Sequence, residues 1–108
     1  MRGNIKTRAM QITIQSIHFK ADQKLTNLIN RKVSKLESYF DRITDAEVFL
    51  KLENEGAQIK DKTVQIKLNL PKGTLMSHQT TKQFERSLDG ALSSLKGQLA
   101  RHKEKLRN

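Results

Sequence analysis

The 108-residue sequence contains no cysteine, no tryptophan and a single proline, and few of its residues are aromatic. Without cysteine the chain has no disulfide, no thiolate nucleophile and no cysteine-ligated metal, which suits a reducing cytosol. The longest apolar runs, such as Val48–Leu50, are far shorter than the ~20 residues of a transmembrane helix, and the N-terminus has no apolar signal core. We therefore expect a soluble, cytoplasmic protein with no membrane partner.

Residue groups that carry catalysis or bind cofactors are also missing. The three histidines, His18, His78 and His102, are far apart in the sequence and no two have helical metal-ligand spacing, so no metal site is predicted. No glycine-rich phosphate loop occurs, and no serine or carboxylate has a base partner nearby in the sequence. We expect no enzyme, no catalytic residue, no cofactor and no small-molecule substrate.

Acidic residues are scarce relative to basic ones. The 21 lysines and arginines outnumber the 11 aspartates and glutamates, which gives a formal net charge of +10. The surplus is concentrated at the ends, because residues 1–20 and residues 82–108 each carry a net charge of +4. So strong a positive excess on so short a chain is typical of proteins that bind polyanions, above all nucleic acids.

Four segments alternate apolar and polar residues, as half-buried strands do. These segments are residues 10–15, 46–52, 64–70 and 74–80. Past Ser16 the apolar parity shifts, which predicts a bulge or a strand end there. Pro71–Gly73 predicts a hairpin turn into the fourth strand, and this short, polar strand is expected at a sheet edge. Residues 54–58 are predicted to form a turn or loop, and Phe49 falls on the polar parity of its strand, where it either packs or stacks on a base.

Two other segments space their apolar residues by three and four, as amphipathic helices do. The first helix is predicted over residues 22–41, with Asp22 as its N-cap. The second is predicted over residues 82–107, and Gly90 and Gly97 within it each cost about 1 kcal/mol relative to alanine. Its predicted apolar face comprises Phe84, Leu88, Ala91, Leu92, Leu95, Leu99, His102 and Leu106, with His102 in a packing role.

The resulting element order is βαβββα, and the predicted fold class is α+β. We expect a two-layer sandwich in which two helices pack on one face of a four-stranded sheet and leave the other face polar. At this length the chain holds one domain. That domain is predicted over residues 10–108, preceded by a flexible basic N-terminal extension, residues 1–9, which has no periodicity.

Three segments of the chain resemble the ribosome hibernation-promoting factors, also called ribosome-associated inhibitors or sigma-54 modulation proteins. The segments are KLESYFDRI at 35–43, PKGTLMS at 71–77 and SLDGALSSLKGQLARHKEK at 87–105. Their order and spacing on a βαβββα frame match the family from Met10 onward. Long members carry a second, dimerising domain, and because this chain stops before one, it resembles the short form and is expected to be monomeric off the ribosome.

The resemblance implies a factor that binds the small ribosomal subunit in the channel between its head and body. There it would overlap the mRNA and the A- and P-site tRNA positions and inhibit translation under stress or in stationary phase. Its expected partners are the 16S rRNA and neighbouring ribosomal proteins. In such a complex, phosphate contacts supply affinity through counterion release, and the shape of the RNA channel supplies specificity.

The family contacts rRNA through basic residues on its two helices. By position these are Lys32 and Lys35 in the first helix and Arg101 and Lys103 in the last. Ser94 and Gly97 stand where the last helix of the family is usually basic, and basic residues occur instead at neighbouring positions of that helix. We expect one positive surface built from both helices, with the rRNA-binding residues Lys24, Arg31, Lys32, Lys35, Lys96, Arg101, Lys103, Lys105 and Arg107.

Two other functions stay open at this point. One is a double-stranded RNA-binding module, which has a related order of strands and helices and binds duplexes by shape. The extra first strand, and the absence of that module's basic motif at the start of the last helix, count against it. The other is a protein-interaction domain, such as a transcription-factor modulator, that uses the open sheet face or an edge strand.

Overall fold

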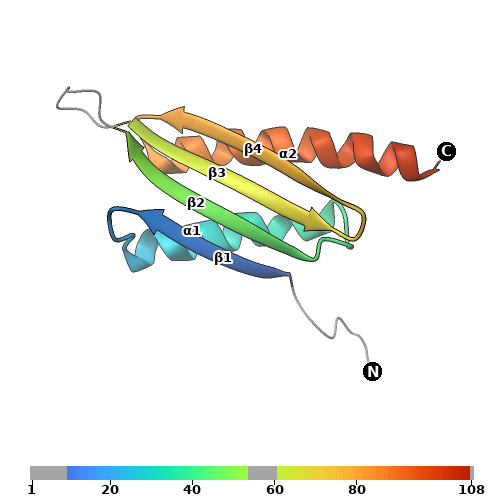
Figure 1. The fold of residues 1–108 in the computed structure, drawn as a ribbon, viewed down its shortest axis with the longest axis horizontal. Helices are drawn as coiled ribbons and strands as arrows, with labels where there is room; N and C mark the ends of the chain where they lie inside the picture. Colours follow the sequence, from blue (N-terminus) through green and yellow to red (C-terminus); the bar gives the residue numbers. More distant parts are fainter. Residues whose placement is uncertain (1–9, 54–60, 108) are drawn as a thin grey trace.

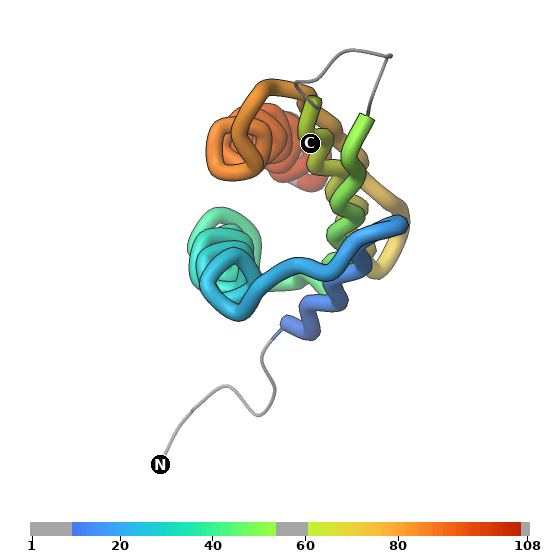
Figure 2. Tube along the Cα trace, turned by 90° about the vertical axis from the view of Figure 1, so that its left-hand side faces the viewer, coloured from blue at the N-terminus to red at the C-terminus, as the bar shows by residue number. Residues whose placement is uncertain are grey.

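The computed structural model describes residues 10–53 and 61–107. The expected extension at 1–9 and the expected loop at 54–58 lie outside these residues. The elements follow the predicted order (Figure 1): β1 (Gln11–Ile17), α1 (Gln23–Ser34), the 3-10 helix η1 (Lys35–Ser38), β2 (Asp45–Glu53), β3 (Asp61–Leu70), β4 (Gly73–Thr81) and α2 (Phe84–Arg107). The strands form one sheet, and both helices lie on the same side of it (Figure 2), so the predicted α+β two-layer fold is confirmed.

The sheet is mixed, with the strand order β1-β2-β3-β4. β1 runs parallel to β2, and the other neighbours are antiparallel. Parallel neighbours need a crossover connection, which α1 and η1 provide here. Leu70 pairs with Gly73 across a turn formed by Pro71 and Lys72, so the predicted hairpin is confirmed. As its polar sequence predicts, β4 lies at an edge.

Alternation along the strands separates a core face, covered by the helices, from an open face. The buried strand residues on the core face are Ala46, Val48, Leu50, Val64, Ile66, Leu68 and Leu70. β1 contributes the half-buried Ile12 and Ile14. Its register with β2 is continuous from Gln11 to Ile17, so the parity shift past Ser16 marks a strand end and no bulge. The chain turns at His18, which has a φ of 66° in the left-handed region.

Helix α1 begins where the sequence predicts but ends earlier. Asp22 caps it by accepting a hydrogen bond from the backbone N–H of Leu25 at 2.8 Å. The prediction of an α-helix as far as residue 41 was wrong, because α1 ends at Ser34 and tightens into η1. Apolar spacings of three and four suit an α-helix and a 3-10 turn alike, so the periodicity does not separate them. After η1, Phe40 still packs in the core.

Helix α2 packs its predicted apolar stripe on the sheet as far as Leu99. His102 then packs edge-on against Phe40, with ring centroids 5.3 Å apart, so its predicted packing role is confirmed. Leu106 does not extend the buried face, because its side chain is 53% exposed. The reason is geometric: the last turns of α2 extend past the end of the sheet (Figure 1), where no strand lies beneath them.

One of the two glycines in α2 has a structural reason. A Cβ at Gly90 would lie 2.8 Å from the Cγ of Gln79, so the glycine lets α2 approach β4 closely. At Gly97 a Cβ would meet only Nη1 of Arg101, at 3.8 Å, and nothing in the described structure explains this glycine.

Candidate nucleic-acid interface

Helices α1 and α2 lie side by side over the sheet and run in the same direction (Figures 1 and 2). Contacts join α2 first to α1 and then to the segment that follows η1. Lys32 pairs with Asp89, the ammonium of Lys96 lies over the ring of Tyr39, and Phe40 meets His102. The outer side of this seam is hollowed at three places, which together we call the inter-helix groove.

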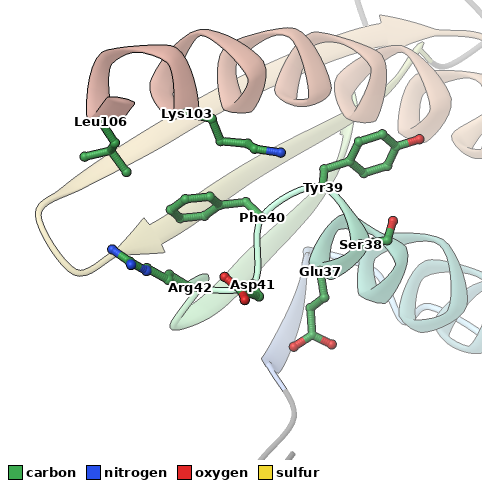
Figure 3. A pocket seen from close by; sticks show the side chains of 8 residues that line it. All are labelled: Glu37, Ser38, Tyr39, Phe40, Asp41, Arg42, Lys103 and Leu106. Carbon is green, nitrogen blue, oxygen red and sulfur yellow. The ribbon is translucent and has the colours of Figure 1, made fainter. Parts of the chain in front are cut away.

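The three hollows differ in their lining. The first, of about 600 Å³, is lined by Asp22, Lys24, Leu25, Asn27, Leu28, Arg31 and Glu85. The central hollow, of about 480 Å³, is lined by Lys32, Ser34, Lys35, Ser38, Tyr39, Asp89, Leu92 and Lys96. The end hollow (Figure 3), of about 500 Å³, is lined by Glu37, Ser38, Tyr39, Phe40, Asp41, Arg42, Lys103 and Leu106.

Six of the nine predicted site residues line this groove. They are Lys24 and Arg31 in the first hollow, Lys32, Lys35 and Lys96 in the central hollow, and Lys103 in the end hollow. Four of these six residues belong to α1 or η1, and the other two belong to α2. The fold therefore brings together residues that are distant in the sequence. These six residues therefore lie along one seam, in three hollows lined by α1, η1, the segment after η1 and α2.

The other predicted residues do not share that surface. Arg101 and Lys105 are each two positions from Lys103, which at 3.6 residues per turn places them about 160° away around α2. Lys105 lies on the flank of Gln98, which donates a hydrogen bond to the backbone carbonyl of Met76 on β4. The backbone of Arg107 belongs to α2, and its side chain is outside the described structure. The positive residues of α2 are thus divided between two flanks.

Lys32 ties the two helices together. Its Nζ donates to Oδ1 of Asp89 at 2.8 Å and to Oε2 of Glu85 at 3.3 Å. The hydrogen bond that Lys32 donates to Asp89, together with the one that it donates to Glu85, raises the pKa of Lys32 above its ordinary value. Lys32 is therefore protonated, and its positive charge is compensated by two carboxylates of α2. Its role is to hold the two helices together and not to offer a free charge to a ligand.

The remaining groove carboxylates are mostly engaged within the protein. Asp22 caps α1, Glu37 accepts a hydrogen bond from the backbone N–H of Met10, and Glu85 and Asp89 bind Lys32. By contrast, five of the six predicted site residues in the groove make no ion pair with any described residue: Lys24, Arg31, Lys35, Lys96 and Lys103. The groove thus presents unpaired cations beside carboxylates that already have partners.

The structure adds two groove residues that the sequence analysis did not select. Tyr39 lines both the central and the end hollow, with Nζ of Lys96 5.3 Å from its ring centroid. Arg42 lines the end hollow opposite Lys103 (Figure 3). Both lie after α1 and η1, so projecting the sequence onto an α-helix cannot predict the direction of their side chains. The segment KLESYFDRI was the available signal, since it contains both residues.

The open face of the sheet has the opposite electrostatic character. By strand alternation it carries Asp45, Glu47, Glu53 and Asp61 against only Lys51 and Lys67, a net charge of −2 among described residues. Phe49 lies on this face, in a shallow hollow of about 210 Å³ that it shares with Ile17, Lys51, Thr63 and Gln65. Stacking of a base on Phe49 stays a prediction.

The described residues also offer no metal site and no membrane-spanning helix. Within residues 10–53 and 61–107, no three histidine, aspartate or glutamate side chains are grouped so as to hold a metal ion. None of the described helices is both long enough and apolar enough to cross a membrane.

The sequence matches one known family along nearly the whole described chain. A match to the family described as "Sigma 54 modulation protein / S30EA ribosomal protein" spans residues 12–107. This range contains both α-helices and all four strands, except for the first residue of β1. The chain belongs to the S30EA family.

Curated S30EA relatives match along nearly their whole length. The chain is 30% identical over 96 residues to the ribosome hibernation promoting factor of Pseudomonas putida, and the match covers 89% of each protein. It is 31% identical over 98 residues to the ribosome hibernation promoting factor of Escherichia coli K12, which covers 91% of this chain and 98% of the relative. A relative of the same name from Salmonella typhimurium is 32% identical.

Solved structures show the same S30EA fold. A ribosomal subunit interface protein from Coxiella burnetii superposes with a TM-score of 0.78 at 18% identity, covering 88% of this chain and 99% of that one. The N-terminal domain of Protein Y from Thermus thermophilus superposes with a TM-score of 0.73 at 19% identity and the same coverage. At these identities the likeness establishes the fold alone.

Proposed function

We propose that this protein is a ribosome hibernation factor. It binds the small ribosomal subunit in the mRNA and tRNA channel, at the A and P sites, and inhibits translation under stress or in stationary phase. The names of the curated relatives, ribosome hibernation promoting factors that match over most of this chain, support the role. Its partners are then the 16S rRNA and neighbouring ribosomal proteins, and its compartment is the cytoplasm.

One observation carries the proposal: five of the predicted cations, which have no ion-pair partner among the described residues, line the three hollows of the inter-helix groove. Such cations neutralise phosphates and release counterions, which supplies affinity without reading a base sequence. Ribosomal RNA presents closely spaced phosphates, and cations that line a groove can pair with several of them at once. The binding set we propose is therefore Lys24, Arg31, Lys35, Lys96 and Lys103, with Lys32 holding the helices in register.

The charge distribution also orients the protein. The groove side presents the unpaired lysines, whereas the open sheet face has a net charge of −2. Phosphates attract the first surface and repel the second. We propose that the helices face the RNA and that residues 10–108 act as one binding unit, monomeric when free. Residues 1–9 serve as a basic extension of that unit. Inhibition then follows from occupying the channel and needs no catalysed step.

Cosedimentation with purified small subunits in sucrose gradients tests the proposal. The decisive variant is Lys35→Glu with Lys96→Glu, and the matched control is Lys51→Glu with Lys72→Glu, which changes the net charge equally at exposed sites away from the groove. We expect the groove variant to lose association and the control to keep it. Equal loss in both variants would mean that overall charge alone drives binding and would contradict the assignment of the groove.

Salt dependence gives a second readout. If the five free cations neutralise about five phosphates, the logarithm of the binding constant falls with the logarithm of salt concentration at a slope of about −3.5 to −4.5. A binding constant that does not change between about 50 and 200 mM salt would contradict the electrostatic mechanism. Equal affinity for isolated RNA duplexes would favour a double-stranded RNA module, and association that survives nuclease digestion would favour a protein partner.

A further inference from the structure

Tyr39 occupies an unusual place for a large aromatic side chain. It follows η1 directly, and its neighbour Phe40 turns into the core while the Tyr39 ring points the other way, along the groove (Figure 3). The Tyr39 side chain is 43% exposed. Partial exposure is common for tyrosine, but this ring opens onto a hollow that Lys35 and Lys96 also line.

The surroundings of the ring match the chemistry of a nucleotide. Nζ of Lys96 lies over the ring, 5.3 Å from its centroid, which is a cation–π contact. Lys35 lines the same central hollow four residues before Tyr39. The hollow, at about 480 Å³, lies within the range of about 300–1,000 Å³ that small-molecule sites span. Two ammonium groups beside an open aromatic face can bind a phosphate and a base at once.

We propose that the central hollow holds one unpaired RNA nucleotide, with its base stacked on the Tyr39 ring and its phosphate between Lys35 and Lys96. This inference rests on the proposed function, because it specifies which part of the ribosomal RNA the groove binds. A base within a duplex is covered on both faces by its neighbours, whereas an unpaired base has a free face for an aromatic side chain. The groove therefore recognises a single-stranded or bulged position, and continuous duplex RNA lacks the feature that Tyr39 contacts.

Stacking and charge make separable contributions, and this gives a sharp test on small subunits. Replacing an aromatic stacking residue by alanine weakens binding roughly 5- to 150-fold per base. This loss does not depend on counterions, so Tyr39→Ala should weaken binding with the salt slope unchanged. Lys96→Ala should instead reduce the slope by about 0.7 to 0.9, the loss of one phosphate contact. Tyr39→Phe keeps the ring and should bind like the wild type.

The chain offers a direct optical probe as well, since Tyr39 is its only tyrosine and tryptophan is absent. Titration with a short oligouridylate should quench the tyrosine fluorescence, and an RNA duplex of the same length should quench it far less. Binding of the oligouridylate measured by ultrafiltration, without quenching, would overturn the stacking proposal. Quenching by duplex and single strand alike would overturn the preference for an unpaired base.

The outcomes separate this inference from the function on which it rests. If wild-type protein fails to associate with small subunits, the proposed function falls, and the oligouridylate titration alone decides whether the hollow binds unpaired RNA. If wild type and Tyr39→Ala associate equally well, the stacking proposal is wrong and the proposed function stands. Thermal melts of each variant exclude unfolding as the cause of a loss, and no large change is expected because the side chain is exposed.

Discussion

Lys32 of α1 donates a hydrogen bond to Asp89 of α2 over 2.8 Å, and this ion pair joins the two helices that wall the groove. Asp89 and Glu85 are one helical turn apart, so both reach the same ammonium group. The pair connects residues 57 positions apart in the chain. Its role is therefore to set the spacing between the helices on which the free lysines stand.

We predict that this pair contributes to stability in a pH-dependent way. The pKa of Lys32 in the folded protein is raised above its ordinary 10.5, chiefly by the hydrogen bond to Asp89. The contribution is therefore fully present below about pH 10.5 and is lost as the pH rises through the raised pKa. Because the pair is partly exposed, Lys32→Met should cost no more than about 1 kcal/mol at neutral pH.

Urea denaturation of wild type and Lys32→Met at neutral and at strongly alkaline pH checks this prediction. The difference in unfolding free energy should shrink as the pH rises through the raised pKa of Lys32, where the ammonium loses its proton. Lys51→Met serves as the control, because Lys51 makes no ion pair with a described residue and its difference should not change in the same way. A difference that grows with pH would contradict the assigned direction of the pKa shift.

We predict that the two glycines of α2 respond differently to replacement by alanine. Alanine is favoured over glycine in a helix by about 1 kcal/mol. At Gly97 the new methyl group meets only Nη1 of Arg101 at 3.8 Å, so Gly97→Ala should stabilise the protein by about 0.5 to 1 kcal/mol. At Gly90 it would meet Cγ of Gln79 at 2.8 Å, so Gly90→Ala should lose that gain. Chemical denaturation measures both, and Gln79→Ala should restore the gain at position 90.

Leu99 and Leu106 lie on one predicted stripe of α2 but differ in burial. Leu99 is fully buried, so Leu99→Ala should destabilise the fold by about 2 to 5 kcal/mol through lost burial and the cavity left behind. Leu106→Ala should change stability by no more than about 0.5 kcal/mol. Comparable losses at the two positions, measured by thermal or chemical denaturation, would show that the end of α2 packs as the periodicity alone indicated.

These residues show how far the sequence determines the fold. Alternation at Val48, Leu50, Val64 and Ile66 was enough to place the strands, because a residue's side of a sheet depends only on local parity. Helical spacing predicted the buried stripe of α2 but not where burial ends along the helix. Whether Leu106 is covered depends on where the sheet ends. The end of α1 was missed for a related reason, as α and 3-10 turns share the same apolar spacing.

The candidate site was less predictable than the fold. The lysines of α1 and of the middle of α2 were identified because charge is visible in the sequence. Pairing is not visible: nothing local indicates that Lys32 is neutralised by Glu85 and Asp89, whereas Lys35 has no such partner among the described residues. Tyr39 was overlooked as a site residue because its exposure follows from the turn after η1, which only the packed chain reveals.

Lys103 and Arg101 allow the groove to be tested within a single helix. Both are exposed cations near the end of α2, yet Lys103 lines the end hollow and Arg101 lies about 160° away around the helix. If the groove is the RNA-binding surface, Lys103→Ala should lower the salt slope of small-subunit binding by about 0.7 to 0.9, and Arg101→Ala should leave the slope unchanged. The two variants lose the same charge, so a general electrostatic effect would weaken both equally. A larger effect at Arg101 would instead place the contact on the flank of α2 that faces β4, and the groove would then be the wrong surface.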